Sequence, residues 1–222
     1  MRRSPLRFAA LAVALLGLTA GAAAARQIAV PASGERNFEA DFGIHVGMMG
    51  RVGDARLRIN TNGPNYAAIF NTEATGVARW AVGKSQDYKQ SARGAITPEA
   101  VRPTSHERTG GRRGRVVRVA FSGADVTTTA TPALGSMGNP PASRAQRLEG
   151  IDFVSAFVSM VFGVAGPDPC ARTLRIYDGR QRFDLAMRPN GVQRVNIQGF
   201  RGEARRCRVS YRPIAGFTDP TS

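Results

Sequence analysis

The sequence predicts a mainly β protein: a curved, largely antiparallel sheet, open or closed into half a barrel, with one short buried apolar helix and a disulfide staple. Three observations favour this fold. Short segments in which apolar and polar residues alternate recur along the chain, and this period of two is typical of half-buried strands. Turn dipeptides such as Asn62-Gly63 separate neighbouring segments. Beyond the N-terminal 25 residues, only residues 153–162 are apolar at nearly every position over a length that suits a helix.

The first half of the chain contains seven predicted strands. In the first of them Phe38, Phe42 and Ile44 alternate with polar residues, and the last two can pair across the Gly110-Gly111 turn. The seven segments cover residues 38–46, 52–60, 66–72, 77–82, 88–93, 104–107 and 115–121.

The connection over residues 131–149 contains several glycines and prolines and shows no periodicity. We therefore expect a long irregular segment, and connections of this length are usually functional or mobile.

The apolar segment that follows is predicted to be a helix. Asp152 is placed to cap its start, Ser155 and Ser159 lie on one stripe, and Gly163 and Gly166-Pro167 end it. Because nearly every other position is apolar, we expect the helix to be buried on most sides, as a plug within the curved sheet. The side chains expected to line an apolar groove are those of Phe153, Phe157, Met160 and Val161.

In the last third of the chain, the sequence predicts a meander of four strands over residues 173–177, 180–187, 192–197 and 204–212. Asp178-Gly179 and Pro189-Asn190-Gly191 are predicted to be the turns. Cys170 and Cys207 are the two cysteines of the chain, and we expect them to form a disulfide worth about 4 kcal/mol. Their wide spacing is unlike that of a structural zinc site, so no metal is expected.

Residues 1–25 have the features of an export signal peptide. Arg2, Arg3 and Arg7 precede an apolar run that is shorter than the roughly 20 residues of a membrane-spanning helix. We expect cleavage near Ala25, and no later stretch is long enough to span a membrane. The remaining chain is then divided into a flexible leader over 26–36, a single β-rich domain over 37–217 and a tail over 218–222.

The net charge of +15 at first suggests a nucleic-acid partner. Three of the arginines leave with the signal peptide, and an exported protein rarely meets nucleic acid, so no such partner is expected. The charge is better explained by solubility and by attraction to the anionic cell envelope. Candidate contacts with an anionic surface are Arg112, Arg113 and Arg115, which lie at a predicted hairpin tip.

No catalytic motif is present. The chain lacks a Gly-x-Ser-x-Gly elbow, and its two histidines, His45 and His106, are expected to be solvated. Asp178 lies at a turn position that favours aspartate, and Asp184 is expected to form surface ion pairs with arginines. We therefore expect neither an enzyme nor a bound cofactor.

Several motifs of the last third together resemble the DUF3108 family of exported bacterial proteins. The likeness covers most of the mature chain and is weaker before residue 90. The resemblance implies a periplasmic location and no established activity. The residues that carry it are Ile151-Asp152-Phe153-Val154-Ser155-Ala156, Pro169-Cys170, the run from Ile176 to Leu185 with its Asp178-Gly179-Arg180 turn, Cys207, and the run from Tyr211 to Phe217.

Three functions are then considered. The first is a non-enzymatic periplasmic module that binds an apolar ligand, such as a lipid or a lipoprotein segment, in a groove of the curved sheet. The second is an envelope-integrity or interaction protein that docks on anionic envelope components through its arginines. The third, an uncharacterised enzyme, lacks a nucleophile, base and orienting group that could be argued from spacing.

Overall fold

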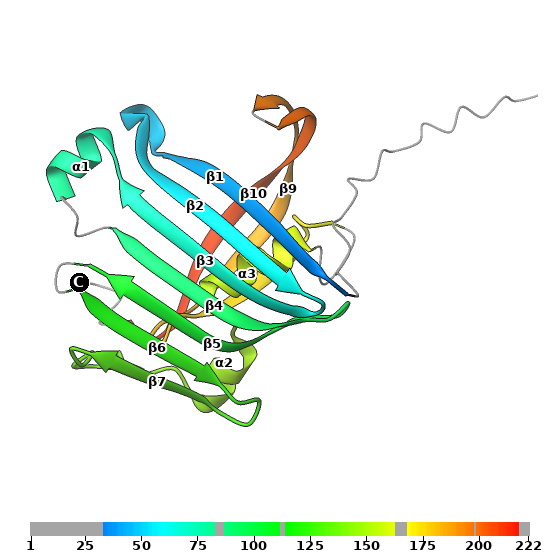
Figure 1. The fold of residues 1–222 in the computed structure, drawn as a ribbon. Coiled ribbons are helices and arrows are strands. Elements are labelled where there is room, and N and C mark those ends of the chain that lie inside the picture. Colours follow the sequence, from blue (N-terminus) through cyan, green and yellow to red (C-terminus); the bar gives the residue numbers. More distant parts are fainter. Residues whose placement is uncertain (1–32, 83–86, 112–113, 163–167, 198, 218–222) are drawn as a thin grey trace, which may run out of the picture.

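A computed structural model describes residues 33–82, 87–111, 114–162, 168–197 and 199–217. The predicted signal peptide and tail lie outside the described residues. The fold is mainly β, and its antiparallel sheets are open, as the sequence predicts (Figure 1). No helix within the described ranges is long and apolar enough to cross a membrane.

Seven strands form the larger sheet, and each strand pairs with the next one in sequence. A short 3-10 turn, η1 (Gly47–Met49), joins the first two strands, and helix α1 (Gly76–Val82) follows the third. The strands are β1 (Glu35–His45), β2 (Arg51–Asn62), β3 (Asn65–Ala74), β4 (Tyr88–Ile96), β5 (Val101–Gly110), β6 (Arg115–Phe121) and β7 (Val126–Thr131).

The smaller sheet contains three strands in the order β10-β9-β8. They are β8 (Arg172–Tyr177), β9 (Arg182–Ile197) and β10 (Phe200–Ala215), and two helices, α2 (Arg144–Glu149) and α3 (Phe153–Val161), precede them. Helix α3 lies between the two sheets (Figure 1). Its Val154 and Val158 pack against the larger sheet, and its Ala156 packs against the smaller one.

The alternation in the sequence separates two faces of the larger sheet. The inner face, which packs on α3, carries buried side chains such as Leu57, Ile59 and Phe70. The outer face carries ion pairs between neighbouring strands, including Asp41 with Arg56 at 2.6 Å. Helix α3 therefore packs on the inner face.

Residues 77–82 were expected to form a strand, and they form helix α1 instead. Gly76, with a φ of 55°, turns the chain away from the sheet. The Arg79 guanidinium then lies 2.9 Å from the Asp87 carboxylate, so an ion pair ties the helix to the start of β4. The position beside β3 is taken by β4, and a strand over 77–82 has no partner to pair with.

The connection over 131–149 is only partly irregular, because it ends in α2. Ser143 and Gln146 form a reciprocal capping box at the start of this helix. The Ser143 hydroxyl accepts from the backbone amide of Gln146, and the Gln146 side-chain oxygen accepts from the backbone amide of Ser143. The expectation of a structureless segment up to residue 149 was therefore wrong.

Pro189-Asn190-Gly191 was expected to be a turn, and it lies inside the continuous strand β9. The last residue of β9 that pairs with β8 is Met187, so beyond it one edge of β9 is free. A proline is tolerated at such an edge because no ladder hydrogen bond is lost there. Gly191, with a φ of 85°, accommodates the register shift opposite Arg205 and Cys207.

Candidate functional site

Helix α3 begins where the sequence places its cap. The Asp152 carboxylate accepts a hydrogen bond from the Ser155 amide at 2.9 Å. Five residues of the helix are buried: Val154, Ser155, Ala156, Val158 and Ser159.

The four predicted groove residues form the remaining stripe of α3. Phe153, Phe157, Met160 and Val161 are only partly buried. Their spacing of four, three and one residues puts them on one side of the helix. The helix is therefore buried on most sides, as expected, and keeps one apolar stripe in partial contact with solvent.

Aromatic rings connect this stripe to the larger sheet. The Phe157 ring stacks on that of Phe70 with centroids 4.9 Å apart, and the Phe153 ring meets Phe70 at 5.8 Å. The ring of Phe42, on edge strand β1, lies 6.1 Å from Phe157. The apolar stripe thus continues onto the inner side of β1.

One edge strand of each sheet, β1 and β10, exposes apolar side chains on the face that packs on α3. On β1, Phe42 and Ile44 are each 39% exposed. On β10, Tyr211 is paired with Leu185, a residue that packs in the cluster beneath α3, and Val209 lies two residues away on the same face. We call Phe42, Ile44, Phe153, Phe157, Met160, Val161, Val209 and Tyr211 the inner apolar surface.

Two open depressions lie on the other side of the larger sheet. Their volumes are about 650 and 570 Å³, and polar and charged side chains of the outer face, such as Glu73, Lys89 and Glu107, line most of them. Neither depression reaches α3.

A buried polar chain anchors α3 to the larger sheet. The hydroxyl of Tyr66 lies 2.6 Å from that of Ser155, which in turn donates to the Asp152 carboxylate. Because Ser155 has one hydroxyl proton, Tyr66 must be the donor to Ser155. Burial, together with the nearby Asp152 charge, raises the pKa of Tyr66, so the phenol stays a neutral donor.

His106 contributes to the same place, contrary to the expectation that it is solvated. Its side chain is 1% exposed, and its Nδ1 lies 3.3 Å from Asp152 Oδ1. The reason is its position on the inner face of β5, paired with the buried residues Ala92 and Val119. His45, by contrast, is exposed at the end of β1, as expected.

Asp184 was expected to form surface ion pairs, and the structure buries it instead. Its carboxylate accepts from Arg182 at 2.6 Å and from Arg212 at 2.5 Å. Burial alone raises the pKa of Asp184, but the hydrogen bonds from the two arginines outweigh it and leave the pKa below its usual value. Arg182 is buried as well. Asp184 and the two arginines therefore form a group of ion pairs between β9 and β10 of the smaller sheet.

The predicted anionic contact lies mostly outside the part of the chain that the structure describes. Arg112 and Arg113 lie outside the described residues, and Arg115, the first residue of β6, is partly buried. Asp178 does occupy a turn, where its carboxylate accepts from the Arg180 and Gln181 amides. The same carboxylate lies 3.1 Å from Arg108, which ties the turn to the larger sheet.

The predicted disulfide between Cys170 and Cys207 is present. It links the start of β8 to β10 across the intervening strand β9, and Cys170 is fully buried. Such bonds are typical of proteins from oxidising compartments. Among the described residues, no three potential ligand side chains cluster as a metal site would require.

The sequence matches the model of one protein family. The model of a protein family of unknown function, DUF3108, matches residues 37–221. The chain belongs to this family. No curated protein and no solved structure matches it. What a DUF3108 protein of this kind does must therefore be argued from its own surface.

Proposed function

We propose that this DUF3108 protein is a non-enzymatic periplasmic module that binds the acyl chain of a lipid or a lipoprotein against its inner apolar surface. The observation that carries the proposal is the partly exposed apolar stripe of α3, which the Phe42 ring extends onto the edge of the larger sheet. Tyr211 is exposed on the face of the smaller sheet that packs on α3. Ligand sites are lined mostly by apolar and aromatic side chains, as this surface is.

The aromatic side chains of the stripe are held in place by the core and are still partly exposed. Phe153 and Phe157 each pack on Phe70, so their positions are fixed before any ligand arrives. Rigid aromatic side chains lose little conformational entropy on binding, and each buried methylene of an acyl chain gains about 0.8 kcal/mol. A preformed surface of this kind suits a flexible acyl chain.

The edges of both sheets support the same conclusion. Ile44 on β1 and Val209 on β10 are exposed apolar residues on strand faces directed toward α3. Single exposed apolar residues are common on protein surfaces, but these two lie on the same strand faces as the apolar clusters around α3. An acyl chain would cover them.

A periplasmic location is part of the proposal. It is supported by the signal-peptide features of residues 1–25 and by the Cys170–Cys207 disulfide, since disulfides persist in that compartment.

The test is to purify the protein from the periplasm of its own cells and to extract it with organic solvent for mass spectrometry. We expect a stoichiometric acyl lipid, and a melting temperature that rises when the stripped protein receives that lipid class. Absence of any acyl lipid, together with no melting shift from any added lipid, would refute the proposal.

A further inference from the structure

The far part of the β9–β10 hairpin projects beyond the rest of the smaller sheet. Strand β8 pairs with β9 only as far as Met187, so residues 188–208 form a two-stranded ribbon. We call these residues, Gln198 excluded, the arm. Six arginines and one glutamate are its charged residues: Arg188, Arg194, Arg201, Arg205, Arg206, Arg208 and Glu203.

The outer half of the arm has two different faces. Side chains paired across an antiparallel ribbon share a face, and successive pairs alternate. The pairs Ile197 with Phe200 and Val195 with Gly202 make one face apolar. The pairs Asn196 with Arg201 and Arg194 with Glu203 make the other face polar and cationic.

The apolar face is open at the tip of the arm. The side chains of Ile197 and Phe200 are 64% and 48% exposed. The next charged residues along the two strands are Arg194 and Arg201, both exposed. The tip is therefore apolar, and the charged residues that follow it are the two arginines and the exposed Glu203, which is paired with Arg194.

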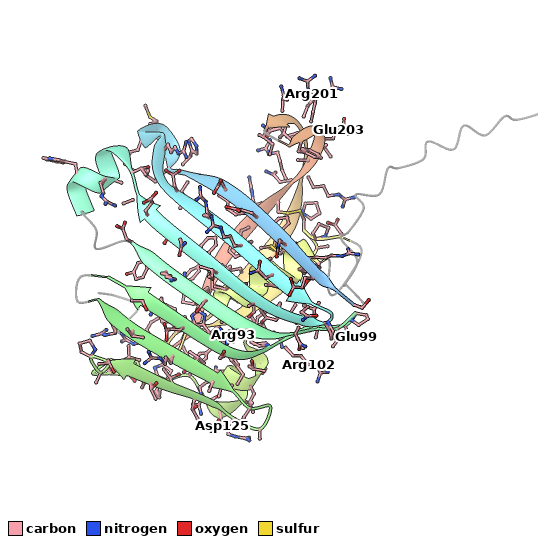
Figure 2. All side chains as sticks on the ribbon, viewed as in Figure 1. Arg93, Glu99, Arg102, Asp125, Arg201 and Glu203 are labelled. Carbon is pink, nitrogen blue, oxygen red and sulfur yellow. A yellow bond between two sulfur atoms is a disulfide. The ribbon has the colours of Figure 1, made fainter. Side chains whose placement is uncertain are left out.

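Two other exposed apolar groups lie at the same end of the molecule. Met48 and Met49 in η1 are exposed, and Trp80 in α1 is 89% exposed. Gly76 at the start of α1 lies beside the backbone of Arg51, so η1 and α1 are neighbours. In Figure 1 both project from the upper end, as the tip of the arm does. Figure 2 labels Arg201 there and Arg93 and Arg102 well below.

We propose that this end of the protein docks on an anionic lipid bilayer. Ile197, Phe200, Met48, Met49 and Trp80 enter the interface, and Arg194 and Arg201 contact the lipid head groups. Tryptophan and other apolar side chains favour the membrane interface, and basic residues beside them are attracted to anionic lipids. The excess of arginine over acid in the arm selects an anionic surface over a neutral one.

The proposal does not rest on the acyl-binding function. A protein could dock in this way and carry no lipid, or carry lipid without docking. The two fail separately, because binding of a monomeric acyl chain involves the inner apolar surface and docking involves the tips.

The single tryptophan of the chain makes docking directly observable. Vesicles of pure phosphatidylcholine are compared with vesicles containing phosphatidylglycerol at one part in three. With the anionic vesicles, we expect co-sedimentation and a shift of Trp80 emission to shorter wavelength, both reversed by added salt. Failure to bind the anionic vesicles, equal binding to both kinds, or binding without the Trp80 shift would each overturn the proposal.

Three double variants identify the surface. Ile197→Ser with Phe200→Ser should abolish the Trp80 shift, and Arg194→Gln with Arg201→Gln should weaken binding to anionic vesicles about 25-fold, at about fivefold per arginine. The matched control is Arg93→Gln with Arg102→Gln, which removes the same charge from exposed positions on β4 and β5. Equal weakening by the control would overturn the proposal. So would a dimer in sedimentation velocity that the tip variants dissociate and that does not bind vesicles, since the tip would then be an interface between two copies.

Discussion

Asp152 combines two roles at the scale of a single residue. It caps α3 through the Ser155 amide, and it ends the buried chain that runs from Tyr66 through the Ser155 hydroxyl. The capping role follows from the sequence, because an aspartate precedes an apolar run there. The partners Tyr66 and His106 do not, since they reach Asp152 only once β3 and β5 have paired into the sheet.

Replacing Asp152 should therefore cost more than replacing an exposed cap. We expect Asp152→Ala to lower the free energy of unfolding by about 3 kcal/mol, because the cap is lost and buried donors lose their acceptor. The matched control is Ser143→Ala in the exposed capping box of α2, which should cost about 1 kcal/mol. Urea unfolding of the two variants measures both values. Equal losses would show that the buried chain adds nothing.

The cluster around Asp184 predicts how stability depends on pH. The pKa of Asp184 is lower in the folded state than in the unfolded chain, so its contribution is present above about pH 4. It is lost as the pH falls further and the folded carboxylate takes up a proton. As the pH is lowered below 4, we expect the urea concentration at the unfolding midpoint of the native protein to decrease. The midpoint of Asp184→Asn should decrease less over the same pH range. Parallel pH profiles would contradict this assignment.

At the scale of elements, α3 is the feature that sequence reasoning describes best. Its cap and its extent to within one residue follow from Asp152 and from the apolar run after it. Helix α2 was missed although Ser143 and Gln146 have capping-box spacing, because the glycines and prolines before it dominate the segment. The turn predicted at Pro189 was wrong because the sequence does not reveal that β9 continues past the end of β8.

The aromatic contacts of α3 give a prediction about Phe157. Phe157→Ala should lower the free energy of unfolding by about 3 kcal/mol, because the ring stacks on that of Phe70 and meets the ring of Phe153 edge to face. Phe157→Asp should leave no cooperative unfolding transition, since it adds a charge next to that cluster. Thermal unfolding followed by near-ultraviolet circular dichroism distinguishes the two. A cooperative transition in Phe157→Asp would mean that the helix does not hold the sheets together.

The disulfide predicts a further loss of stability. Cys170→Ser with Cys207→Ser should lower the free energy of unfolding by about 4 kcal/mol, because the cross-link restricts the unfolded chain over the 37-residue separation of the cysteines. Chemical denaturation of the variant, compared with the native protein without reductant, measures it. A loss below about 1 kcal/mol would mean that the hydrogen-bonded pairing of β9 with β10 is sufficient alone.

At the scale of the whole molecule, the sequence predicts an open, curved, antiparallel β fold but not its division into two sheets. Alternation shows which side chains of a strand share a face and does not show which strands pair. The inner apolar surface could likewise be predicted only in its α3 part. Phe42 and Tyr211 join it because β1 and β10 happen to be edge strands.

The most direct test of the acyl-binding function is to titrate the protein with a fluorescent 16-carbon fatty acid below its micelle concentration. Two isoleucines provide a matched pair: Ile44, 39% exposed on the inner face, and Ile69, 38% exposed on the outer face of β3. We expect saturable one-to-one binding that Ile44→Ser with Val209→Ser weakens at least fivefold. Ile69→Ser should leave it unchanged. Absence of saturable binding, or equal weakening by Ile69→Ser, would contradict the proposed function.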